Sequence, residues 1–139
     1  MPLLTRLFIK SAFVYLAAAL LVSLLRALTP FLPLPAFIHT LNPVYFHLFL
    51  VGWVTELIIG VAYWMFPKFT REVPRGSTGL AWTTYILLNT GLILRVIAEP
   101  IMTLQPSRLW GGLLALSALL QWLAGLAFVI NTWPRVKER

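Results

Sequence analysis

Few side chains in this 139-residue chain can do chemistry: there are two histidines, four acidic residues and no cysteine. Without cysteine there is no disulfide, no thiolate metal ligand, no thiol nucleophile and no covalently attached c-type haem. Acyl and phosphoryl transfer are not expected either, because no loop is long enough for a triad and no glycine-rich phosphate loop is present. Chemistry in this chain therefore depends on histidine, carboxylate, methionine or a bound cofactor.

Both histidines belong to one layer, near the same end of the expected helices. His47 lies about 6 Å inside the second apolar segment, Arg95 lies at a similar depth in the third, and Arg26 of the first falls close by. The same layer holds His39, Met102, Glu99 and Tyr45. A neutral imidazole can ligate haem iron, and arginines at this depth suit two propionates. The layer predicts haem b bound by His47, Arg95 and Arg26, since zinc or copper needs three or four convergent ligands.

Each of these residues also has a structural interpretation. Arg26 and Arg95 can snorkel to the headgroups, and His47 can be a neutral imidazole hydrogen-bonded within the bundle. If His47 does hold iron, the sixth position falls to His39, to Met102 or to a neighbouring chain's His47, or it stays open.

A second polar layer lies deeper in the expected bundle. Glu56, Asn89 and Gln121 each fall about 15 to 17 Å from the cytoplasmic ends of the second, third and fourth helices. Glu56 follows His47 by nine residues, and about 900° of helical rotation puts the two on nearly opposite faces. We expect a structural network that joins these three helices; the functional alternative is one stop on a proton path.

The elements that must position these residues are membrane helices. Hydrophobic residues make up 60% of the chain and charged residues 11%, against about 25% charged in a soluble domain. Apolar runs and proline or serine punctuation predict helices over 11–28, 43–66, 78–98 and 108–132. Asn42 and Ser77 are the expected N-caps, and Pro100 follows the end of the third helix. The proline-rich stretch 29–42 is expected to be a loop or re-entrant segment, and residues 1–139 to form one all-α integral membrane four-helix bundle.

The basic residues predict how this bundle is oriented. Eight of the eleven lie in the N-terminus, the 68–75 connection and the tail that holds Arg135, Lys137 and Arg139. The positive-inside rule then puts both termini in the cytoplasm and the chain, as a multi-pass protein, in the cell membrane. The net charge of +7 is explained by this topology and by anionic lipid, so no nucleic-acid partner is expected. Signal-peptide cleavage is not expected, because 26–30 lacks a small-x-small site.

The second segment, from Tyr45-Phe46-His47 through Gly52-Trp53 to Gly60 and Pro67, resembles the second helix of haem-copper oxidase and nitric oxide reductase catalytic subunits. The resemblance implies that His47 is a haem axial ligand. Gly52 then allows close approach of a helix backbone or a flat macrocycle. The fold is expected to be similar to one four-helix unit of the oxidase subunit I. The family has about twelve helices and copper-ligating histidines that this chain lacks, so no complete oxygen-reducing centre can form in one chain.

Three functions compete on these grounds. The first is a b-type membrane cytochrome for one-electron transfer or diatomic-gas binding, with an electron-transfer partner and homo-oligomers, a trimer by fold analogy or a dimer. The alternative is a non-catalytic structural or assembly subunit of a respiratory complex. A third is a small transporter or channel built around Glu56, Asn89 and Gln121, for which no discontinuous-helix pattern is present.

Overall fold

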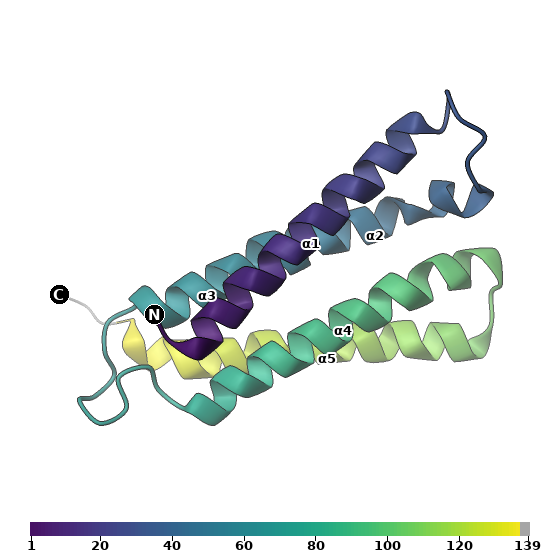
Figure 1. Cartoon of the computed structure of the whole chain (residues 1–139). Helices are drawn as coiled ribbons and strands as arrows, with labels where there is room; N and C mark the ends of the chain where they lie inside the picture. The colour runs from purple at the N-terminus through teal and green to yellow at the C-terminus, as the bar shows by residue number, and fades with distance from the viewer. Residues whose placement is uncertain (137–139) are drawn as a thin grey trace.

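The structure is a computed structural model that describes residues 1–136, and it is all-α (Figure 1). Four helical segments within this range are long and apolar enough to cross a membrane, so the chain is a multi-pass membrane protein. They are α1 (Leu3–Leu28); η1, α2, η2 and α3 in continuous succession (Ala36–Leu41, Asn42–Phe46, His47–Thr55 and Glu56–Met65); α4 (Thr78–Leu104); and α5 (Arg108–Thr132), followed by η3 (Trp133–Arg135). Lys137 and Arg139 of the predicted basic tail lie outside the described residues.

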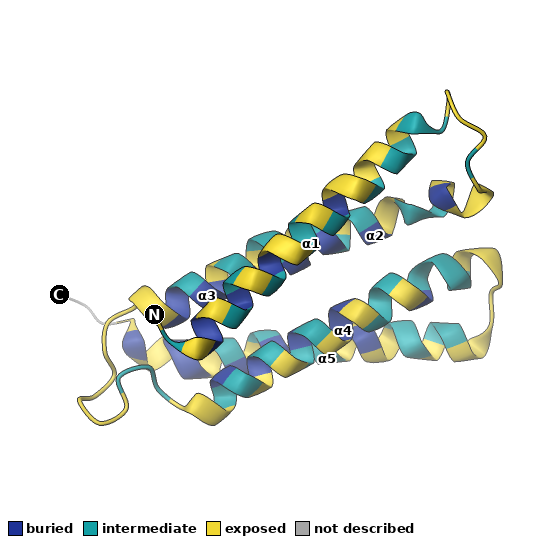
Figure 2. Cartoon of the chain, in the orientation of Figure 1, coloured by how far each residue is buried: buried dark blue, intermediate teal, exposed yellow. Residues whose placement is uncertain are grey.

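The segments form two antiparallel hairpins, α1 with α2–α3 and α4 with α5 (Figure 1). The N-terminus, the 66–77 connection and η3 lie at one end of the bundle, which we call the terminal end. The 29–41 and 105–107 connections lie at the other, which we call the opposite end. Because every long helix keeps large apolar side chains exposed, among them Phe13, Ile58, Ile93 and Trp122, the outer faces suit lipid (Figure 2).

Three helix ends differ from the sequence expectation. The stretch 29–42 was expected to be a loop or re-entrant segment, but its residues 36–41 form η1, which continues directly into α2. The first helix begins at Leu3 rather than near residue 11, and Thr5 and Phe8 in its added turns are buried. The third was expected to end at 98, but α4 continues through Pro100 to Leu104. Proline removes only its own N–H bond and crowds one carbonyl, and membrane helices tolerate this because neighbouring groups satisfy the freed backbone. Glu99 is therefore helical and lies one turn after Arg95.

The predicted N-caps have different outcomes. Ser77 caps α4 as expected, since its hydroxyl accepts the Leu80 N–H at 3.3 Å. Asn42 does not cap: it is the first residue of α2, and no side chain satisfies the start of that helix. The preceding η1 turns already run into α2, so no free helix start remains there for Asn42 to cap.

The terminal half of the bundle is held by close packing between α1, α3 and α4. The Phe8 ring stands edge-on to Tyr85, with centroids 5.0 Å apart. Gly60 lets α3 approach α1, because a Cβ there would lie 2.7 Å from the Phe8 Cβ. Buried residues gather where these helices meet (Figure 2). This half is the rigid part that fixes the deeper polar groups.

Arg135 has a different role from the one its charge suggested. It was expected to be a surface charge that sets topology, but it is only 1% exposed. Its guanidinium donates to the carbonyls of Tyr63 (3.1 Å), Phe66 (2.8 Å) and Pro67 (3.1 Å). The Tyr63 carbonyl lies in the last turn of α3 and the other two follow the end of that helix, so Arg135 caps α3 and ties η3 to it.

Candidate functional site

His47 stands at the start of η2, a nine-residue π-helix. Its Nδ1 lies 2.9 Å from the Pro43 carbonyl oxygen, one turn earlier. A carbonyl can only accept, so Nδ1 carries the proton and Nε2 keeps its lone pair. The side chain is 27% exposed, and Nε2 makes no hydrogen bond within residues 1–136. His47 therefore has one ring nitrogen held by the backbone and one without a protein partner in that range, as metal-ligating histidines do.

Two charged residues of α4 adjoin His47. Glu99 Oε2 lies 3.4 Å from His47 Nδ1, and Glu99 Oε1 lies 3.3 Å from Arg95 Nη1. Arg95 Nε donates to Ser117 Oγ of α5 at 3.4 Å. We call His47, Glu99, Arg95 and Ser117 the outer cluster. Arg95 pairs with Glu99 Oε1, and Glu99 Oε2 is buried beside the imidazole without a hydrogen-bond partner among the described residues.

The other residues expected in this layer lie apart from the outer cluster. His39 is exposed on η1, whereas Arg26 and Met102 are half-buried near the ends of α1 and α4. Within residues 1–136, no hydrogen bond or ion pair joins any of the three to His47. The structure thus brings together His47, Arg95 and Glu99 of the expected layer, and it adds Ser117.

Gly52 serves helix packing. A Cβ at this position would lie 2.8 Å from Tyr15 Cβ and 2.9 Å from Leu92 Cδ2. Such distances are too short for any side chain, so the glycine is needed for α1 and α4 to approach η2. This contact accounts for the glycine without a macrocycle beside it.

The deeper polar layer is a network of four residues from three segments, which we call the inner network. Glu56 Oε1 accepts from Ser11 Oγ at 2.8 Å and from Asn89 Nδ2 at 2.6 Å. The Tyr15 hydroxyl donates to Asn89 Oδ1 at 2.6 Å. Gln121 was expected here but donates to Ser117 Oγ at 3.1 Å instead, which ties it to the outer cluster.

Ser11 and Tyr15 are the members of the inner network that sequence reasoning missed. They lie one turn apart on an otherwise apolar stretch of α1, and this i, i+4 polar pair was the signal available. The sequence predicted a network between the second, third and fourth helices. The structure joins α1, α3 and α4, because the short Ser11 side chain faces Glu56 directly.

The expectation that His47 and Glu56 face opposite sides is wrong. Both bond to α4, His47 through Glu99 and Glu56 through Asn89. The residues between them form η2, where i→i+5 bonding puts more residues in each turn than an α-helix has. The rotation about the helix axis per residue is therefore smaller than in an α-helix. After nine residues, Glu56 faces toward the same side of the helix as His47.

Comparisons of the chain with protein-family models, with curated proteins and with solved structures find no match. The site must therefore be interpreted from its own geometry.

Two features of that geometry limit its chemistry. No group of three or more His, Cys, Asp or Glu side chains that could hold a bare metal ion occurs in the described part of the chain. An apolar groove of about 380 Å³ lies between α1, α2 and α4, and Val44 and Leu48, which flank His47 in sequence, line it. The outer cluster can thus supply one nitrogen ligand with a carboxylate and an arginine close to it, and none of its four residues lines the groove.

Proposed function

We propose that this protein binds haem b in the membrane through His47 Nε2. The observation that carries the proposal is the bond from Nδ1 to the Pro43 carbonyl, 2.9 Å long. Metal-ligating histidines generally donate their second N–H to a carbonyl or carboxylate, which fixes the tautomer and the ring orientation. For His47 this acceptor is the Pro43 carbonyl, and the Glu99 Oε2 atom lies 3.4 Å from the same nitrogen without a hydrogen bond to it.

Charge and surface at the outer cluster support the same proposal. Arg95 is a fixed cation at the level of His47, and its planar fork suits a propionate carboxylate. The groove beside Val44 and Leu48 is apolar and comparable in size to small-molecule sites. One imidazole is enough to hold haem iron, whereas a bare ion would need more ligands than this cluster offers.

The chemistry follows from the coordination of the iron. Bound haem would supply one-electron transfer with two axial ligands, or diatomic-gas binding if one position stays open. The chain's own residues would bind and orient the group: His47 as ligand, the Pro43 carbonyl as the acceptor that holds its ring, and Arg95 as a counter-charge. His39 and Met102 are the candidates for a second ligand from the same chain, and a neighbouring copy in a homo-oligomer is the alternative.

The experiment is haem reconstitution of the purified full chain in detergent or lipid, followed by absorption spectra before and after dithionite. A Soret band is expected for the wild type. His47→Ala should abolish it, and His39→Ala is the matched control that should retain it, since His39 is exposed on η1. A colourless wild type, or an unchanged band in His47→Ala, would contradict the proposal. A colourless protein that co-purifies with other respiratory subunits would favour an assembly role.

A further inference from the structure

The Glu56 carboxyl group is more deeply buried than any other acid in the described chain, and one of its two oxygens has no hydrogen-bond partner. Its side chain is 1% exposed, and Oε2 is buried with no hydrogen-bond partner. The two ion pairs within residues 1–136 do not include it. An uncompensated carboxylate at this depth is costly, so the protonated acid is the favoured form of Glu56. Oε1 already accepts two bonds, which puts the proton on Oε2.

The groups that face Glu56 leave it as the titrating site. From α1 they are Ser11 and Tyr15, and from α4 they are Asn89 and Tyr85, whose backbone carbonyl also accepts from Asn89. Tyrosine loses its proton only in strong base, and serine and asparagine do not titrate. The carboxyl group is therefore the member of this set that can exchange a proton with water.

A cavity lies one helical turn from Glu56 toward the terminal end. Its volume is about 10 Å³, and it is lined by Phe8, Ile59, Tyr63, Ala81, Thr84, Phe128 and Asn131. Phe8 precedes Ser11 by three residues and Ile59 follows Glu56 by three, so the cavity adjoins the inner network on both helices. This volume is close to the space that one buried water occupies.

A second orphaned oxygen lies in the same interior. Thr5 is 0% exposed, and its Oγ1 is buried without a hydrogen-bond partner. The Thr5 carbonyl lies 3.6 Å from the Cβ position of Gly60, the residue one turn after Glu56. Buried hydroxyl and carboxyl oxygens without protein partners are where ordered water is found.

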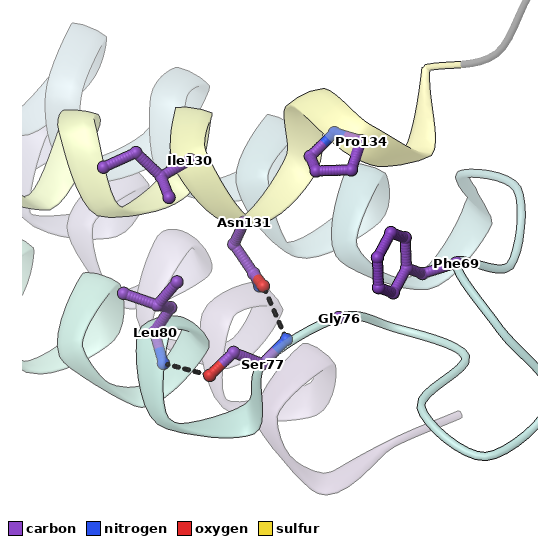
Figure 3. Close-up of a pocket in the computed structure, with 7 residues that line it drawn as sticks. All are labelled: Phe69, Gly76, Ser77, Leu80, Ile130, Asn131 and Pro134. Carbon is purple, nitrogen blue, oxygen red and sulfur yellow. Dashed lines mark hydrogen bonds between the residues drawn. The ribbon is translucent and has the colours of Figure 1, made fainter.

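Asn131 connects this cavity to the outside. It also lines an open pocket of about 160 Å³ at the terminal end, with Ser77, Leu80 and Pro134 among its neighbours (Figure 3). There the Asn131 Oδ1 accepts the Ser77 N–H at 2.7 Å. Gly76 has φ +74° and leaves room for the Asn131 amide, because a Cβ there would lie 2.6 Å from Oδ1. Asn131 is thus the residue that lines both the open pocket and the cavity.

We propose that Glu56 is a proton-binding site inside the membrane. Water delivers the proton and takes it up again from the terminal end, by a route past Asn131. A proton carried by water adds to the carboxylate at Oε2 to give the acid, and the same route returns it to water. The outer cluster lies beyond the inner network and is not part of this route. The proposal does not depend on haem.

The test is infrared spectroscopy of the full chain in lipid, with no haem added, during transfer from H₂O to D₂O. A C=O stretch of a protonated carboxylic acid is expected. Glu56→Gln should remove it and Glu99→Gln should retain it. The band should shift to lower frequency as deuterium replaces the proton. Asn131→Leu and Thr84→Val should slow this exchange by about tenfold, because each removes a polar partner of the transferring water.

Thr84→Val keeps the shape of the side chain, so it serves where Asn131→Leu weakens the fold. Thr103→Val is the matched control, since Thr103 is exposed near the opposite end, and it should exchange at the wild-type rate. The proposal is overturned by a wild type without the acid band, by a band that survives in Glu56→Gln, by a band that D₂O does not shift, or by wild-type exchange in Thr84→Val.

Discussion

The outer cluster and the inner network both join the second helical segment to α4, yet they differ in openness and charge. His47 is 27% exposed and has a charged carboxylate and a guanidinium as neighbours. Glu56 is 1% exposed, and its partners are the neutral groups of Ser11 and Asn89. One helical segment can therefore carry two polar sites that differ in exposure and in the charge of their neighbours. The outer cluster is partly open to the surface, whereas Glu56 of the inner network is enclosed.

The largest effect is expected at Gly52, which lies between the two sites. Gly52→Ala puts a Cβ 2.8 Å from Tyr15, so the ring must move and its bond to Asn89 must break. Overpacking of this kind costs about 2 kcal/mol of unfolding free energy. Denaturant titration in mixed micelles measures it. Gly125→Ala is the control, because nothing lies within 4 Å of that Cβ position. Equal stability of the two variants would refute the packing described for η2.

Asn89→Leu is expected to cause the second-largest loss of unfolding free energy. It removes the donor to Glu56 and the acceptor for Tyr15, and two interhelical bonds in a membrane protein are worth about 1.5 kcal/mol together. Gln121→Leu, measured in the same micelles, should cost less, since Gln121 bonds only along α5. A larger loss of unfolding free energy in Gln121→Leu than in Asn89→Leu would instead support the network that the sequence predicted.

Glu99→Gln sharpens the comparison from the outer side. The variant loses the charge beside Nδ1, and loss of such an orienting partner weakens metal-centre affinity by about tenfold. Haem titration followed at the Soret band gives this value, with Glu72→Gln on the exposed connection as control. Affinity unchanged in Glu99→Gln would remove Glu99 from the site.

The smallest effect is expected from Ser11→Ala. It removes one hydrogen bond to Glu56 Oε1, which is worth about 0.6 kcal/mol in a membrane bundle. Ser23→Ala, on an exposed face of the same helix, should leave the unfolding free energy unchanged. A loss of several kcal/mol in Ser11→Ala would mean that Glu56 depends on this hydroxyl for its protonation state.

The four membrane helices could be predicted because hydropathy and length act locally along the chain. Glu99 could not be placed as a partner of His47, since the proline rule ended the third helix before Pro100. The π-helix had no sequence signal, and it alone reversed the expected facing of His47 and Glu56. The role of Ser11 could not be predicted, because it depends on which helix packs against Glu56. Tertiary packing rather than any local pattern determines that.

The most direct test is a haem titration of the wild type, His47→Ala and Glu56→Gln side by side. The two sites are separate in this account. His47→Ala should therefore bind no haem, while Glu56→Gln should give the wild-type Soret band and affinity. A band retained in His47→Ala, or one lost in Glu56→Gln while that variant stays folded, would contradict the separation of the outer cluster from the inner network.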